Sequence, residues 1–170
     1  MIREPRRVGV YLAAAAAHHA EIHTRAGELE ALGYRITSRW HASEADERHM
    51  TTEQRGELAD RCLRDVEDAD ILVAFTEPPD TTFARGGRHV EVGYALGLDM
   101  RIVVVGYLEN VFHCLEGVQF FATWPEALAR LAEAHPFDTA PVSRPSIEER
   151  LEGLSIDELD ALEASGEVFE

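Results

Sequence analysis

The stretch ILVAFTEPPDTTFARGGRHVEVGYALGLDMRIVVV, residues 71–105, decides the fold of this chain. Its two ends, Ile71–Phe75 and Ile102–Val105, are short apolar runs typical of strands that are buried on both faces of a parallel sheet. Between them lie a loop rich in Pro, Gly and Thr, Thr76–Gly87, and a helical pattern, His89–Leu98. The stretch therefore predicts a strand, a helix and a second, parallel strand.

The same alternation extends to both sides of this unit. The further expected elements are a strand at Arg7–Ala13, a helix at His18–Leu32 that ends at Gly33, a strand at Tyr34–Trp40, a helix from Thr51 or Thr52 to Asp68, a strand at Gln119–Thr123 and a helix at Pro125–Ala134. Strands that alternate with helices predict a parallel sheet covered on both faces. We expect an α/β fold, a flavodoxin- or Rossmann-like three-layer sandwich with a five-stranded, mostly parallel sheet of order 2-1-3-4-5.

A chain of 170 residues fits one domain, which we place at residues 1–135. Residues 136–170 are expected to form a linker and an acidic helical tail. The linker carries three prolines within His135–Pro145, and two capping boxes follow, Ser146-x-x-Glu149 and Ser155-x-x-Glu158. The short helices that they predict would pack on the domain or on a neighbouring subunit.

The charge of the chain restricts its partners. The formal net charge is −16, and sequence-independent binding to nucleic acid requires a basic surface instead. No apolar run is long enough to cross a membrane, and the N-terminus does not resemble a signal peptide, so a cytoplasmic protein is expected. The two cysteines and eight histidines show none of the spacings of metal sites, and we expect neither a catalytic metal nor another cofactor.

Ligands of open parallel sheets bind at the carboxyl ends of the strands, near the reversal of strand order. Glu91 follows the third strand and lies near the start of the next helix, where the helix dipole stabilises a carboxylate by about 0.3–1 kcal/mol. A charged and oriented carboxylate suits a nucleophile. Gly86 and Gly87 let the backbone approach a ligand, and Gly93 and Gly97 are expected to press this helix against the sheet. On these residues alone, a Glu91 that only complements the helix dipole is the simpler interpretation.

Four separated pieces of the chain resemble the nucleoside 2-deoxyribosyltransferase family and its nucleotide N-glycosidase relatives. They occur in the order and spacing of that family, between about residues 7 and 130: Val10–Ala14, Ala69–Val73, Gly86–Ala95 with Glu91-x-Gly93-Tyr94-Ala95, and Glu109–His113. The Glu-x-Gly-Tyr-Ala element after a Gly pair is the most specific of them.

The resemblance implies a reaction in which Glu91 attacks C1′ of a 2′-deoxynucleoside, expels the base and holds the sugar as an ester. A second base or water then takes the sugar. Tyr11 matches the tyrosine whose hydroxyl orients the glutamate. Where the family has an aspartate as proton donor, this chain has Cys62. The nearby acids are Asp60, one helical step away, and Asp65, and the loop before Glu91 offers Asp80. Asp60 is our candidate acid.

The candidate substrate-binding residues lie mainly in the segments that end the strands. They are Ala13, Trp40, Asp70, Thr76, Glu77, Asp80, Gly86, Gly87, His89 and Asn110. Structural roles compete with several of these assignments. Asp70 could equally be a cap at the start of a strand, Trp40 a core or interface residue, and Asn110 a contact with the ligand of a neighbouring subunit.

Three functions remain open at this point. The leading one is a nucleoside 2-deoxyribosyltransferase, and the second is a hydrolase that cleaves nucleoside 5′-monophosphates through the same intermediate. The third is a non-catalytic nucleotide sensor, which the cysteine at position 62 favours. The expected partners are a small nucleoside or nucleotide, a free base and further copies of the chain in a homo-oligomer.

Overall fold

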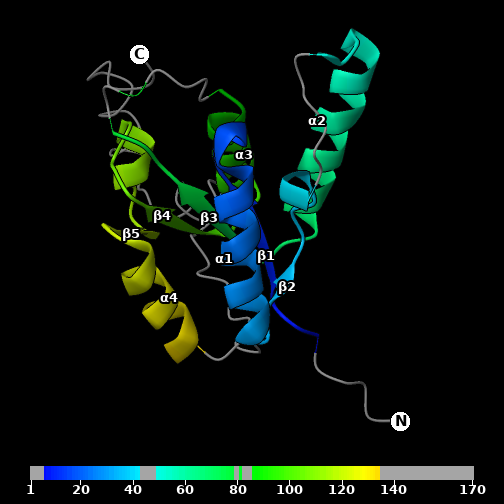
Figure 1. The fold of residues 1–170 in the computed structure, drawn as a ribbon. Helices are drawn as coiled ribbons and strands as arrows, with labels where there is room; N and C mark the ends of the chain where they lie inside the picture. Colours follow the sequence, from blue (N-terminus) through cyan, green and yellow to red (C-terminus); the bar gives the residue numbers. More distant parts are fainter. Residues whose placement is uncertain (1–5, 43–48, 79–80, 82–85, 135–170) are drawn as a thin grey trace, which may run out of the picture.

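A five-stranded sheet forms the centre of the fold in the computed structural model, which describes residues 6–42, 49–78, 81 and 86–134. All strand pairs are parallel, and the order is β2-β1-β3-β4-β5 (Figure 1). The strands are β1 Gly9–Ala13, β2 Arg35–Ile36, β3 Ile71–Phe75, β4 Arg101–Val105 and β5 Val118–Phe121. The predicted α/β class and strand order are confirmed.

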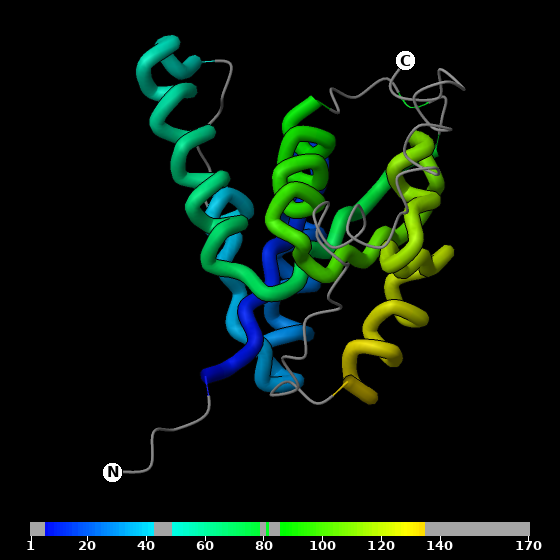
Figure 2. Tube along the Cα trace, turned by 180° about the vertical axis from the view of Figure 1, so that it is seen from behind, coloured from blue at the N-terminus to red at the C-terminus, as the bar shows by residue number. Residues whose placement is uncertain are grey.

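Two helices cover each face of the sheet. One face carries α1 (His19–Ala31) and α4 (Trp124–Glu133), whereas α2 (Thr52–Glu67) and α3 (Gly86–Gly97) lie on the opposite face (Figures 1 and 2). Three 3-10 helices, η1 (Ala16–His18), η2 (Trp40–Ala42) and η4 (Val111–Cys114), lie in the connections. Among the described residues, no helix combines the length and apolarity needed to span a membrane.

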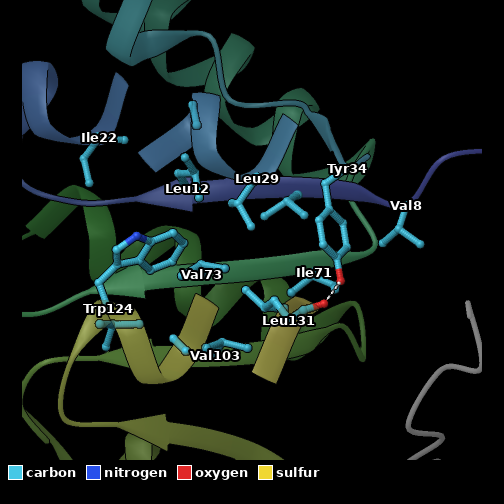
Figure 3. Packing of buried hydrophobic residues seen from close by; sticks show 14 residues of the cluster. Val8, Leu12, Ile22, Leu29, Tyr34, Ile71, Val73, Val103, Trp124 and Leu131 are labelled. Atoms are coloured by element: carbon cyan, nitrogen blue, oxygen red, sulfur yellow. Dashed lines mark hydrogen bonds between the residues drawn. The ribbon is translucent and has the colours of Figure 1, made fainter. Parts of the chain in front are cut away.

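The core is divided by the sheet into two layers. Along β1, Val10 and Leu12 point to the α1/α4 layer, and Tyr11 and Ala13 point to the α2/α3 layer, because side chains alternate along a strand. In the α1/α4 layer the Tyr34 hydroxyl donates to the carbonyl of Leu131 at 2.7 Å (Figure 3). This alternation directs the hydroxyl of Tyr11 toward α3.

The second strand is shorter than its sequence pattern predicts. The alternation over Tyr34–Trp40 favours a strand to position 40, but β2 ends at Ile36 and Trp40 begins η2. Ser38 explains the early end, because its Oγ accepts the Leu12 N–H at 3.2 Å in place of a backbone carbonyl. The chain then turns back, and the Trp40 indole N–H donates to the carbonyl of Leu12 at 2.8 Å.

Helix α3 differs from the prediction at its start and in the face that it buries. It begins at Gly86, three residues before the predicted start, so Glu91 lies in its second turn. Its buried residues are Arg88, Val92 and Ala95. Gly93 and Gly97 are exposed, and a Cβ added at either position would meet no atom within 4 Å. The expectation that these two glycines press the helix against the sheet is therefore wrong.

Asp70 lies at the amino edge of the sheet, directly before β3. Its Oδ2 accepts the Gly9 N–H at 2.7 Å, and the Arg6 guanidinium lies 3.3 Å away. The backbone of β1 and the segment before β3 lie close together here, since a Cβ on Gly9 would lie 2.9 Å from the carbonyl oxygen of Asp68. Ligands of this fold bind at the opposite edge. The assignment of Asp70 to substrate binding is corrected: it fastens the start of β1 to β3.

The predicted division into domains concerns residues that the structure does not describe. The linker and the acidic tail, residues 136–170, lie outside the described range, and their expected helices stay predictions.

Replacing Asp70 by Ala is expected to lower the free energy of unfolding by about 1–3 kcal/mol, because the Gly9 N–H loses a charged acceptor. Urea unfolding at neutral pH measures the change. Asp60→Ala is the matched control: Asp60 is exposed and paired only with Arg64 in the contacts described, at 3.0 Å, so its loss should cost less than about 0.5 kcal/mol. Equal costs for the two variants would contradict the structural role of Asp70.

Candidate active site

Tyr11 and Glu91 form the centre of the candidate site. Tyr11 is completely buried on β1, and its hydroxyl donates to Glu91 Oε1 at 2.6 Å. β1 is the strand at which the order of the sheet reverses, since β2 and β3 pair on its two sides. The two residues are 80 positions apart in the chain, and the fold brings together the pair that the sequence predicts as nucleophile and orienting hydroxyl.

The Tyr11 hydroxyl keeps its proton at any ordinary pH. Burial raises the pKa of Tyr11 far above its usual value, and the neighbouring Glu91 and Cys62 raise this pKa further. A tyrosinate at this position would be desolvated and next to a carboxylate. Tyr11 can therefore act as a permanent hydrogen-bond donor to Glu91, which fixes the position of one of its carboxylate oxygens.

Cys62 is the third member of the cluster, and α2 supplies it. Its side chain is half-buried, and it interacts with both Tyr11 and Glu91. Burial raises the pKa of the Cys62 thiol, and the charge of Glu91 adds to the rise. The sulfur atom consequently carries a proton at neutral pH and is a weak nucleophile.

Asp60, our candidate acid, points away from this cluster. Its carboxylate is 68% exposed and pairs with Arg64 one turn along α2. Residues two apart on a helix face nearly opposite directions, so the rotation that brings Cys62 to Tyr11 sends Asp60 to solvent. The described geometry does not support Asp60 as a proton donor. Asp65 pairs with Arg39 at 2.6 Å, and Asp80 lies outside the described residues.

A buried ion pair anchors the first turn of α3 and was not anticipated from the sequence. Arg88 Nη2 donates to both oxygens of Glu109, at 2.8 and 2.6 Å, and the two side chains are only 1% and 2% exposed. Glu109 also accepts the Glu77 N–H at 3.1 Å. The pair joins the segments after β3 and β4 to the helix that carries Glu91. The signal in the sequence is Arg88 itself, a cation four residues before the apolar Val92 on the buried face of α3.

His89 and Asn110 extend this network. The Asn110 Nδ2 lies 3.3 Å from His89 Nδ1 and 3.3 Å from His113 Nε2, while its Oδ1 accepts the Phe112 N–H at the start of η4. Burial lowers the pKa of His113, which favours the neutral ring. The amide of Asn110 thus bridges two histidines, and Asn110 and His89 also line a hollow between α3 and η4.

The same histidines belong to a cluster with the composition of a metal site. Ligand atoms of His89, Glu109 and His113 lie within 4.8 Å of one another. The contacts around them are those of a hydrogen-bond network instead. Arg88 binds Glu109 with its positive charge, and the Asn110 amide donors lie between the two rings. A cation at this place would be repelled by the charge of Arg88 and would meet the amide donors of Asn110.

Thr76 and Glu77, which follow β3, make mainly structural contacts. Thr76 Oγ1 donates to the carbonyl of Val105 at 2.9 Å and accepts the Tyr107 N–H at 2.6 Å, which ties the ends of β3 and β4 together. Gly106 permits this close packing, since its φ is +116° and a Cβ would lie 2.6 Å from the Thr76 carbonyl oxygen. Glu77 is buried, with Oε1 2.7 Å from His18 Nε2. Both residues line a hollow of about 200 Å³ beside Trp124, on the α1/α4 side of the sheet.

The remaining candidate residues are placed as follows. Ala13 is buried at the end of β1, in the same core layer as Tyr11. Trp40 packs against both core layers and is held by its bond to Leu12, so its ring is a packing element and not a free stacking surface. Gly86 and Gly87 are exposed at the first two positions of α3, where no neighbouring atom requires glycine.

Comparisons with known proteins add a likeness of fold. No protein-family model and no curated protein sequence matches the chain. Among solved structures, the chain is similar to a CMP N-glycosidase of Clostridium botulinum, BcmB, with 21% sequence identity and a TM-score of 0.47. The match covers 74% of this chain and 98% of the other. A likeness at this level says nothing of the reaction, and the fold rests on the strand order described above.

The environment of Cys62 generates a prediction about thiol reactivity. In a Cys114→Ser background, Cys62 is the only thiol, and it should react slowly with a disulfide reagent at pH 8 because little thiolate is present. Glu91→Gln removes a charge that raises the pKa of Cys62, so labelling should become several times faster. Glu116→Gln, at an exposed position, is the control and should leave the rate unchanged. Identical rates in all three proteins would show that Cys62 does not sense Glu91.

Proposed function

We propose that the protein is an enzyme that cleaves the N-glycosidic bond of a 2′-deoxynucleoside or its 5′-monophosphate. The proposal is carried by one observation, the 2.6 Å hydrogen bond from the buried Tyr11 hydroxyl to Glu91 at the reversal of strand order. A single carboxylate that is oriented by a permanent donor is the equipment of a nucleophile for an oxocarbenium-like centre.

The first step forms one bond and breaks one. A Glu91 oxygen attacks C1′ of the sugar, and the electron pair of the C1′–N bond leaves with the base, which takes up a proton. The product is a deoxyribosyl ester of Glu91. Tyr11, bound to Oε1, holds the carboxylate in line and stabilises its charge before attack. None of these steps requires a metal or an organic cofactor.

The second step distinguishes the two enzymatic functions, the transferase and the hydrolase. Attack on C1′ by a nitrogen of another base regenerates Glu91 and gives a new nucleoside, which is the transferase that we favour. Attack by water gives the free sugar, which is the N-glycosidase. Each of the two steps inverts C1′ once, so the β configuration of the sugar is retained.

The second candidate is a nucleotide-binding protein without turnover, and Cys62 favours it. The leaving base needs a proton, and the described group beside Glu91 and Tyr11 is a thiol with a raised pKa instead of a carboxylic acid. A thiol is a poor hydrogen-bond donor. This arrangement fits a protein in which the oriented carboxylate recognises a sugar hydroxyl and cleaves nothing.

Glu91→Gln should lower turnover by roughly a thousandfold or more, because an amide cannot form the sugar ester. The assay incubates the protein with deoxyinosine and adenine, follows deoxyadenosine and hypoxanthine, and is repeated with deoxynucleoside monophosphates. Asp60→Ala is the control and should retain full activity. Release of base without transfer would select the hydrolase, and ligand binding without turnover would select the second candidate. Full activity of Glu91→Gln would overturn the mechanism.

Tyr11→Phe should lower kcat by about 10- to 100-fold and change KM less, since the lost bond to a charged group is worth about 1.5–3 kcal/mol. The acidic limb of the pH–rate profile should move to higher pH, because the ionised carboxylate loses a donor. In the wild type the raised pKa of Tyr11 means that raising the pH does not remove its proton, so Tyr11 should produce no alkaline limb. An unchanged acidic limb in Tyr11→Phe would contradict the orienting role.

A further inference from the structure

The α2/α3 side of the sheet has room for one more helix. Parallel strands are usually joined by an α-helix that covers the sheet, but the described connection from β4 to β5, residues 106–117, contains only the four-residue η4. Val118 of β5 packs on the α2/α3 core layer, so Phe120, two residues further, points to the same side. Phe120 is 41% exposed there (Figure 2). A parallel sheet is normally covered on both faces, so this part of it is open.

A groove of about 680 Å³ runs between α3 and η4 on this side. We call it the α3–η4 groove; it is lined by His89, Val92, Gly93, Leu96, Gly97, Asn110, Phe112 and Leu115. None of these side chains is Asp, Glu, Lys or Arg, although the chain carries 32 acidic and 16 basic residues. The groove therefore fits an apolar surface.

The sequence after α4 carries a segment with such a surface. Residues 146–170 lie outside the described range, and their two capping boxes predict two short helices. Apolar side chains recur within each of them at helical spacing: Ile147, Leu151 and Leu154 in the first, and Ile156, Leu159 and Leu162 in the second. The same 25 positions carry nine acidic residues. Short amphipathic helices of this kind are stable only when their apolar face packs on another surface.

The end of α4 lies within reach of the groove. The Tyr34 hydroxyl donates to the carbonyls of Leu131 and Ala134, at 2.7 and 3.1 Å, which fixes this end of α4 beside the start of β2. Helix α4 packs beside β5, the border strand of the sheet, and η4 lies next to β5 as well. Residues 135–145 can span up to about 36 Å. Passing around β5 from one helix layer to the other takes roughly 20 Å, since packed layers lie about 10 Å apart.

We propose that residues 146–164 dock on the α3–η4 groove of their own chain, with their apolar side chains toward the groove. The sequence leaves open whether these helices pack on the domain or on a neighbouring subunit. Covalent attachment favours the same chain, because a short linker holds a segment near its site at an effective concentration in the millimolar range. The contact is independent of the reaction proposed above.

Charge and backbone shape agree with this occupant. The groove is uncharged, so the acidic side chains of the docked segment face solvent and no charge is buried without a partner. Gly93 and Gly97 lie one turn apart on α3, and an added Cβ would meet nothing within 4 Å at either position. The bare backbone at these two positions lets a docked helix approach α3 closely.

Thiol labelling of the full-length protein tests the docking. Leu115→Cys places a thiol in the groove, in a Cys114→Ser background, and mass spectrometry separates its labelling from that of Cys62. Labelling by a disulfide reagent should be at least tenfold slower than for Ala129→Cys, at an exposed position of α4. Equal rates at the two positions would overturn the proposal. The slow rate should also persist on hundredfold dilution, because the occupant is attached; a rate that rises on dilution would show a separate molecule in the groove.

Two pairs of substitutions outside the domain identify the face that docks. Leu151→Asn with Leu159→Asn should raise the labelling rate at position 115 tenfold or more, because the apolar face is lost. Glu152→Gln with Asp157→Asn, on the polar face, is the matched control and should leave the rate unchanged. Position 129 should be labelled at one rate in all of these proteins. An equal effect of the two pairs, or no effect of the leucine pair, would overturn the proposal.

Disulfide formation then tests whether the segment belongs to the same chain. Leu115→Cys combined in turn with Leu151→Cys, Leu154→Cys and Leu159→Cys should give a disulfide within one chain in at least one of the three proteins. Leu115→Cys with Glu152→Cys is the control and should form at least tenfold less. Disulfides that join two chains, or no excess over the control in any of the three, would overturn the proposal.

Discussion

The hydrogen bond between Tyr11 and Glu91 joins β1, the strand at which the order of the sheet reverses, to helix α3, and the site is organised around this bond. Tyr11 can reach α3 only because β1 and β3 are neighbours and parallel, with Tyr11 opposite Leu72. Glu91 can reach Tyr11 only because Arg88, Val92 and Ala95 fix the rotation of α3. The position of one carboxylate oxygen thus depends on the sheet order and on the packing of a helix.

The sequence predicts the fold because the fold depends on apolar patterns. Buried runs such as Ile71–Phe75 and helical stripes recur often enough to set both the elements and their order. The pairing of Tyr11 with Glu91 was also predictable, through the resemblance to a known family. Ser38 shows the limit of such patterns, since one hydroxyl that replaces a backbone carbonyl ends β2 four residues before the alternation does. Gly93 and Gly97 show it too, because spacing alone does not say which way a helix is rotated.

Side-chain partners across the fold were the least predictable part of the site. Asp60 and Cys62 differ by about half a helical turn: Cys62 lies one turn before the buried Val66, and Asp60 therefore faces solvent. Asp70 precedes a buried strand, which places it at the amino edge of the sheet, and its contact with Gly9 shows that it joins β1 to β3. Arg88 and Glu109 are 21 residues apart, and no local sequence pattern shows that these two charges form a buried ion pair. Breaking such a pair typically costs 3–5 kcal/mol, so it constrains the first turn of α3 strongly.

The short length of β2 affects how readily another chain can add a strand at this edge of the sheet. A strand of two residues at the border of a sheet offers few unpaired amide and carbonyl groups to a passing chain. Immediately after it, Ser38 and Trp40 direct their polar atoms back onto Leu12. This border is therefore a poor template for a sixth strand, and it protects the protein against the continuous sheet growth that leads to fibres.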